Sequence, residues 1–146
     1  MTEIEIFVAK KGNYTDFHMD FQENFTYQLK GSKKWRLRTE RGMQSPVMGF
    51  SPHYAQSSNL EAQAKVIKCY NGVNIGAKYN KTRLAQESTT VTLQEGDIMY
   101  HPAGIWHSVE SITDSISINF SMRQVRSADL IVNALRMHLL QDNILR

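Results

Sequence analysis

The chain has 146 residues, a length that fits one domain of ordinary size and excludes two independent hydrophobic cores. Apolar residues make up 41% and charged residues 21%, so the composition is that of a folded domain and excludes a disordered segment. The 17 Lys and Arg against 14 Asp and Glu leave a net charge of +3, and the basic residues are spread along the chain, which gives no strong signal for nucleic-acid binding.

Cysteine content and the N-terminal residues indicate the cellular compartment. The single cysteine, Cys69, excludes an internal disulfide and any cysteine-rich zinc site. The first residues lack the basic stretch of a signal peptide, and no uninterrupted apolar run approaches the roughly 18 residues of a membrane span. We therefore expect a cytoplasmic protein without a membrane partner.

Apolar and polar residues alternate with period two over most of the chain, which predicts β-strands. Gly31 and Ser32 separate two of these runs and predict a tight hairpin turn, because glycine tolerates the positive φ of such turns. The predicted strands are Ile4–Lys10, Thr15–Phe21, Asn24–Lys30, Lys33–Arg38, Ala64–Tyr70, Thr89–Leu93, Asp97–His101, Ser108–Ile112 and Ser115–Ser121.

Two stretches have the composition of loops. Residues 39–63 contain several glycines and serines and two prolines, and residues 71–88 contain two glycines and several basic residues. Both are expected to be excursions from a β scaffold.

The hydrophobic period changes near the C-terminus. From Ser127 onwards apolar residues recur at three and four residues, which predicts an amphipathic helix. We expect residues 1–126 to form one all-β domain and residues 127–146 to form a helix that packs on it, with a homodimer interface as the alternative.

One pair of polar residues suggests metal chemistry. In a strand, His18 and Asp20 lie on the same face, so an imidazole and a carboxylate stand side by side. His107 would complete a set of two histidines and one carboxylate, which leaves open positions on Fe(II). The chain has five histidines, so such a pair also arises by chance, and the alternative is a hydrogen-bonded sheet histidine beside a turn or edge aspartate.

The surroundings of these residues carry a family resemblance. Residues 15–35, TDFHMDFQENFTYQLKGSKKW, resemble the first metal-binding segment of JmjC-type, cupin-fold 2-oxoglutarate oxygenases. Residues 96–111 and 115–120 look like the second segment of the same family. The greatest likeness is to the hydroxylase branch that includes asparaginyl hydroxylases of the factor-inhibiting-HIF type and ribosomal oxygenases. The resemblance implies an all-β fold, a double-stranded β-helix of the cupin or jelly-roll type, here with a C-terminal α-helix.

The resemblance also implies roles for residues. His18, Asp20 and His107 would bind Fe(II) and form the catalytic centre, and Lys33 would pair with the distal carboxylate of the co-substrate 2-oxoglutarate. Alternation independently places Lys33 on the mostly apolar face of its strand, where an unpaired charge is costly. Its alternative role is that of a surface lysine whose amine reaches solvent.

Further residues are implied with less support. Thr15 falls where the family has a hydroxyl that contacts the same carboxylate, and Asn24 and Asn119 match asparagines that line the co-substrate pocket. Thr15 could instead follow a turn, and Asn119 could lie on a solvated strand face. We expect a supporting or structural role for His101, where the family more often has an apolar residue, and His53 has no partner that is visible in the sequence.

The implied activity is that of an Fe(II)- and 2-oxoglutarate-dependent dioxygenase that hydroxylates a C–H bond and releases succinate and CO2. A protein or peptide side chain is the expected substrate, and a small metabolite is the alternative. Hydroxylation is favoured over lysine demethylation, because the demethylase relatives often use HxE where this chain has HxD. The competing classes are a cupin-like metal-binding module without hydroxylase activity and a structural β protein without a metal.

Overall fold

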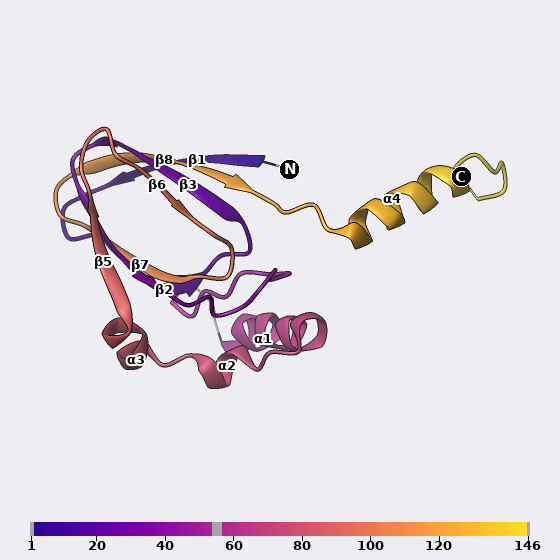
Figure 1. Ribbon diagram of the computed structural model, residues 1–146, viewed down its shortest axis with the longest axis horizontal. Helices are drawn as coiled ribbons and strands as arrows, with labels where there is room; N and C mark the ends of the chain where they lie inside the picture. The colour runs from indigo at the N-terminus through magenta and orange to yellow at the C-terminus, as the bar shows by residue number, and fades with distance from the viewer. Residues whose placement is uncertain (1, 54–56, 146) are drawn as a thin grey trace.

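The computed structural model describes residues 2–53 and 57–145. Within these residues two antiparallel four-stranded sheets face each other as a barrel (Figure 1). The first sheet has the strand order β1-β8-β3-β6 and the second β2-β7-β4-β5. The strands are β1 (Thr2–Ala9), β2 (Tyr14–Met19), β3 (Glu23–Lys30), β4 (Lys33–Arg38), β5 (Ser88–Leu93), β6 (Ile98–His101), β7 (Trp106–Ser111) and β8 (Ser115–Met122).

Strand order confirms the predicted fold class. Every connection between consecutive strands passes from one sheet to the other except β4–β5, which is the winding of a double-stranded β-helix. Eight of the nine predicted strands are present in the described residues, with ends shifted by at most two residues. At the predicted turn Gly31 has φ +68, and a Cβ there would lie 2.1 Å from the Asp114 carbonyl oxygen, so a larger residue does not fit.

The ninth prediction, a strand at Ala64–Tyr70, is wrong. These residues lie in helix α1 (Ser57–Asn71). Leu60, Ala64 and Ile67 are spaced by four and three residues, and they pack against the same hydrophobic cluster. The helical period therefore decides this segment, although its middle part looks alternating.

Two short helices lie in the second stretch with loop composition, α2 (Ile75–Lys78) and α3 (Lys81–Gln86). Each is preceded by an asparagine, Asn74 or Asn80, whose side chain accepts a hydrogen bond from a backbone N–H in the first turn. Such capping satisfies donors that the helix itself leaves free. Sequence composition alone does not distinguish these capped turns from loop.

The hydrophobic core lies outside the barrel. Phe17 and Met19 of β2 and Trp106 of β7 point away from the barrel interior and pack under the segment that connects β4 to β5. That segment contributes the remaining buried members of the cluster, Met43, Phe50, Ile67, Ile75 and Leu84. Burial of each such side chain contributes about 1.5–3 kcal/mol, so packing of the insertion stabilises the second sheet from outside the barrel. Inside the barrel the buried side chains are mostly polar, with Trp35 and Leu93 among the apolar ones.

The helix predicted at the C-terminus is present as α4 (Ser127–Leu139). It extends away from the barrel (Figure 1), and none of its described residues is buried. Its apolar face is exposed, with Ile131 at 67% and Leu135 at 54% exposure. Among the described residues no helix has the length and apolar character that a membrane span requires.

Candidate metal centre

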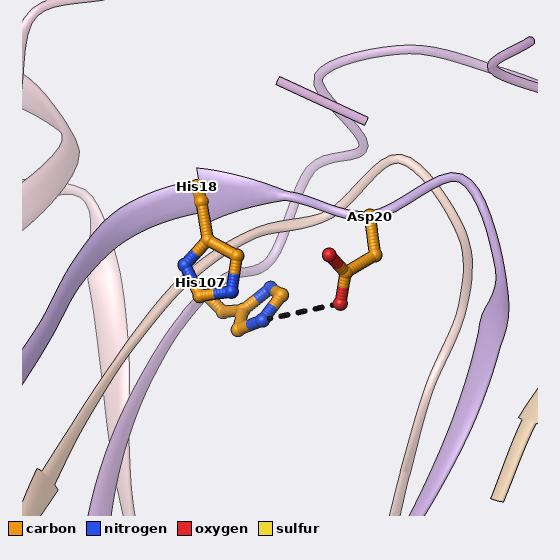
Figure 2. A group of neighbouring side chains, drawn as sticks. All are labelled: His18, Asp20 and His107. Atoms are coloured by element: carbon orange, nitrogen blue, oxygen red, sulfur yellow. Dashed lines mark ion pairs between the residues drawn. The ribbon is translucent and has the colours of Figure 1, made fainter. Parts of the chain in front are cut away.

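His18, Asp20 and His107 converge at one end of the second sheet. His18 and His107 are direct partners in the β2–β7 pair, and Asp20 follows the last residue of β2. The two rings lie 4.1 Å apart between centroids, and His107 Nε2 is 3.6 Å from Asp20 Oδ2. One ligand atom of each residue lies within 4.8 Å of the others, so the three side chains point toward a common position (Figure 2). We call these three residues the triad.

A β-bulge in β2 sets which side chains face the barrel interior. Thr15 pairs with Val109 and His18 pairs with His107, so β2 advances three residues while β7 advances two. Strict alternation would place Thr15 and His18 on opposite faces, and the extra residue brings both to the interior. The bulge also places the Asp16 carbonyl oxygen 2.8 Å from His18 Nδ1.

Both histidines of the triad have a defined proton position. Nδ1 of His18 faces the Asp16 carbonyl, and Nδ1 of His107 lies 3.2 Å from the Ile105 carbonyl. A carbonyl only accepts, so each Nδ1 carries a proton, and Nε2 is the nitrogen of each ring that can bind a metal. Burial, together with the neighbouring His18 and His101, lowers the pKa of His107 well below its usual range, which keeps the ring neutral, as a metal ligand must be.

The carboxylate of the triad is held by hydrogen bonds. Asn24 Nδ2 donates to Asp20 Oδ2 at 2.9 Å, and Ser121 Oγ donates to Asn24 Oδ1 at 2.6 Å. The Gly104 N–H donates to the Asp20 carbonyl oxygen at 2.9 Å and ties the end of β2 to the turn before β7. The structure thus brings Asn24 to the triad itself.

Lys33 is buried in the barrel interior, at 5% exposure. Its Nζ donates to Ser117 Oγ at 2.7 Å and lies 5.5 Å from the centroid of the Phe7 ring. Burial lowers the pKa of the Lys33 amine, and within the described residues no carboxylate forms an ion pair with it. An amine in this setting is suited to bind an anion.

A cavity of about 210 Å³ adjoins Lys33, and Thr15 and Val109 also line it. Val109 lies two residues beyond His107 on β7, which corresponds to about 6.6 Å along a strand. Thr15 and Lys33 thus line the same cavity, and their shared role stays a prediction.

Asn119 lies on β8, and its Oδ1 accepts a hydrogen bond from the Thr26 hydroxyl. Among the described residues it forms no hydrogen bond with the triad or with Lys33. Its predicted place in the co-substrate pocket stays a prediction.

Two more histidines lie beside the triad. The ring of His53 is 5.1 Å from that of His18, and the ring of His101 is 4.5 Å from that of His107, between centroids. His53 lies in the long insertion after β4, so no sequence spacing could place it here. His101 ends β6 and lies directly opposite Asn24 on β3, so its place beside the triad follows from the register of this strand pair.

A larger cavity, of about 410 Å³, lies elsewhere. Arg38, Arg41, Lys78 and Arg83 line it together with Trp106, which belongs to the core cluster outside the barrel. It is therefore separated from the triad by the second sheet. It takes no part in the metal centre.

Comparison with known proteins gives matches to a family and to individual relatives. Residues 1–125 match the cupin-like domain family. The chain is 27% identical over 145 residues to YxbC of Bacillus subtilis (strain 168), which covers 97% of this chain and 40% of that protein. It is 26% identical over 123 residues to JmjC domain-containing protein F of Dictyostelium discoideum, which covers 79% of this chain and 26% of that protein. The chain thus spans less than half the length of both relatives.

Among solved structures, the fold is similar to that of YcfD, a ribosomal oxygenase from Escherichia coli, in complex with cobalt and 2-oxoglutarate. The TM-score is 0.56 at 18% sequence identity, and the alignment covers 95% of this chain and 28% of that chain. At this identity the likeness concerns the fold.

Proposed function

The chain belongs to the cupin-like domain family, and on that premise we propose that it is an Fe(II)- and 2-oxoglutarate-dependent dioxygenase that hydroxylates a C–H bond of a protein side chain. The triad of two histidines and one aspartate supports the metal assignment. The fold shared with YcfD, described as a ribosomal oxygenase, and the likeness of residues 15–35 to the factor-inhibiting-HIF branch support the choice of substrate class.

The observation that carries the proposal is the buried amine of Lys33. A structural β protein has no need of a lysine at 5% exposure without a carboxylate partner in the described residues, because such a charge is costly to bury. A cupin-like module that only binds a metal does not need it either. A co-substrate with a second carboxylate explains the position of Lys33, together with Thr15 in the same cavity.

Each residue has a part in the proposed reaction. Nε2 of His18 and of His107 and a carboxylate oxygen of Asp20 would hold the iron, and Asn24 keeps that carboxylate oriented. Lys33 and Thr15 would bind the distal carboxylate of 2-oxoglutarate. When bound, iron and 2-oxoglutarate supply the oxidising chemistry, with release of succinate and CO2.

The test of the proposal is co-substrate binding without oxygen. Fe(II) and 2-oxoglutarate, added under argon, should produce a metal-to-ligand charge-transfer band. Lys33→Ala should weaken 2-oxoglutarate binding about ten- to hundred-fold, since a charge-assisted hydrogen bond is lost, and should leave metal affinity unchanged. The matched control is Lys34→Ala, because Lys34 pairs with Glu110 at 2.5 Å on the other face of β4.

The outcomes separate the alternatives. A folded protein that binds metal but shows no band would be a metal-binding module, and one that binds no metal would be a structural β protein. Succinate release, screened against peptides and against small metabolites, then decides between a protein hydroxylase and a small-metabolite oxygenase.

A further inference from the structure

The cavity of about 410 Å³ outside the barrel has no part in the proposed reaction. Its walls come from two segments that are far apart in sequence, the end of β4 with the residues after it and the helices α2 and α3, which lie on the outer side of the second sheet (Figure 1). The lining includes four cationic side chains, those of Arg38, Arg41, Lys78 and Arg83. The carboxylate that also lines it, Glu40, is 3.7 Å from Arg38. We call this space the basic cavity.

The positive charges of the basic cavity exceed the negative charges paired with them. Arg38 and Arg83 share one carboxylate, Glu87, at 2.6 Å and 2.7 Å. Among the residues that the structure describes, Arg41 and Lys78 form no ion pair. A cavity lined mainly by one sign of charge attracts groups of the opposite sign, so the basic cavity is suited to an anionic group.

The shape of the basic cavity is also that of a binding site. Its lining includes two buried apolar side chains, Leu84 and Trp106, whereas Arg41, Lys78 and Arg83 are exposed, so the cavity is open to solvent. Its volume lies within the range of about 300–1,000 Å³ that is usual for ligand cavities. The planar arginine side chain can bind a carboxylate or a phosphate through two parallel hydrogen bonds.

The basic cavity and the triad lie at the same end of the second sheet, on its two faces. Leu37 of β4 is the direct partner of His107, and Arg38 follows it. Trp106 precedes His107 and packs on the outer face, where it lines the basic cavity. Because successive residues of a strand are about 3.3 Å apart, the basic cavity begins within one residue of the level of the triad.

Backbone hydrogen bonds connect the wall of the basic cavity to the end of β2. The Gly42 N–H donates to the Gly104 carbonyl at 2.8 Å, and the Gly104 N–H donates to the Asp20 carbonyl at 2.9 Å. Gly42 lines the basic cavity, so this wall is held against the turn that also fixes Asp20.

We propose that the basic cavity binds an acidic segment of a protein. The inference rests on the proposed function for the identity of that protein, which is the substrate: while one of its residues enters the barrel at the triad, a neighbouring Asp or Glu reaches the outer face of the second sheet. An extended chain advances about 3.3–3.6 Å per residue, so a few residues cover this path. A protein is favoured over nucleic acid because the net charge is only +3 and the other basic residues are spread along the chain.

The test measures binding of a fluorescein-labelled hexaglutamate peptide by fluorescence anisotropy at low salt. Arg41→Glu combined with Lys78→Glu reverses the two charges that lack an ion pair. The matched control is Lys65→Glu combined with Lys68→Glu on the exposed side of α1, which changes the net charge by the same amount. Circular dichroism checks that each variant is folded, and Arg41→Ala with Lys78→Ala replaces the cavity variant if that variant is unfolded.

We expect the cavity variant to bind the peptide at least about ten-fold more weakly than wild type, since two charge-assisted contacts are lost. The control should stay within about two-fold of wild type, and wild-type affinity should fall as salt is added, because salt screens the charges. A wild-type protein that does not bind the peptide, or a loss in the cavity variant no larger than in the control, would overturn the inference.

Two competitors distinguish other anions from an acidic peptide. If inorganic phosphate binds more tightly than the peptide and displaces it, the basic cavity is a site for a free anion and the inference is wrong. If a hexauridylate RNA binds more tightly than the peptide and loses its affinity in the cavity variant, the partner is a nucleic acid and the inference is again wrong.

The same proteins are tested for the charge-transfer band with Fe(II) and 2-oxoglutarate under argon. The cavity variant should give the wild-type band, because the second sheet separates its changed residues from the triad. A band without peptide binding overturns this inference alone. Peptide binding that is specific to the basic cavity, without a band in the wild-type protein, overturns the proposed function and supports a site for an acidic partner.

Discussion

Asp20 depends on Asn24 for its orientation. The Asn24 amide donates to the same carboxylate oxygen, Oδ2, that approaches His107, and Ser121 fixes the amide in turn. A carboxylate that is free to rotate would bind a metal more weakly, because binding would restrict it to one of its several conformers. The hydrogen-bonded chain from Ser121 through Asn24 to Asp20 therefore preorganises the site.

We expect Asn24→Ala to lower Co(II) affinity about ten- to hundred-fold, since the aspartate loses its donor. Isothermal titration calorimetry measures the affinity. The control is Asn119→Ala, which removes an amide that bonds to Thr26 rather than to a residue of the triad, and its Co(II) affinity should stay within about two-fold of wild type. Equal effects of the two variants would contradict this role of Asn24.

The burial of Lys33 predicts that stability and 2-oxoglutarate affinity depend on pH. Its pKa is lowered by burial from 10.5, so it loses its charge at a lower pH than an exposed lysine does. In the window between the lowered pKa and 10.5 the folded protein binds fewer protons than the unfolded chain, so the stability of the ligand-free protein should rise with pH there. Affinity for 2-oxoglutarate should fall through the same window, because the neutral amine no longer attracts the carboxylate.

The two opposite trends are measured by denaturant unfolding and by 2-oxoglutarate titration, from about pH 7 upwards. In Lys33→Met the lysine no longer contributes to the pH dependence of stability or of 2-oxoglutarate affinity. Both quantities should therefore change less with pH than they do in the wild-type protein. An affinity for 2-oxoglutarate that rises with pH in the wild-type protein would contradict the pairing.

At the scale of elements, the turn before β7 joins three parts of the molecule. Gly104 donates its N–H to the carbonyl of Asp20, and its own carbonyl accepts from the Gly42 N–H at 2.8 Å. Gly104 has φ +81, and a Cβ there would lie 1.9 Å from the Met43 carbonyl oxygen. The turn thus fixes the end of β2, and with it Asp20, against the insertion.

We expect Gly104→Ala to destabilise the protein by more than the about 1–2 kcal/mol that a left-handed backbone costs alanine, because the insertion must also move. Gly12→Ala is the matched control, since Gly12 has φ +80 but a Cβ added there would meet nothing within 4 Å. Free energies of unfolding from urea titration give the comparison. Equal losses of unfolding free energy in the two variants would show that the close approach to Met43 does not affect stability.

At the scale of the whole molecule, the first sheet is polar inside and apolar outside. Ile4, Ile6 and Val8 of β1 are 66%, 67% and 77% exposed, and the apolar face of α4 is exposed as well. The total accessible surface is 9341 Å², about 1,600 Å² more than the roughly 7,700 Å² typical of a monomer of 16.8 kDa. A stable interface of ordinary size needs about 800 Å² from each partner, so this surface is large enough for one.

We expect a second copy of the chain to cover these surfaces, with α4 at the interface. Light scattering after size exclusion should then give twice the mass of one chain. Ile131→Glu, in the centre of the apolar face of α4, should shift the protein to monomer, and Arg136→Glu, on the opposite face of the same helix, should leave the dimer intact. A wild-type protein that is monomeric over the whole concentration range would rule out this interface.

Period-two alternation along the chain was sufficient to predict eight strands and the interior face of β4 that carries Lys33, whereas the barrel fold was predicted from the family resemblance. It failed where a local pattern competes with long-range packing. Ala64–Tyr70 alternates in part, yet it forms a helix because Ile67 and its helical neighbours pack on the outer face of the second sheet. Thr15 faces the interior only because of the bulge before His18.

The sequence by itself determined which segments become strands and which side chain types could serve a metal and an acid. Only the tertiary structure decided that His53 and His101 join His18 and His107, that Asn24 holds Asp20, and that the barrel interior is polar while the core lies outside it. The reason is physical: hydrophobic period reflects neighbours along the chain, whereas bulges, sheet order and the position of a long insertion are set by contacts between residues far apart in sequence.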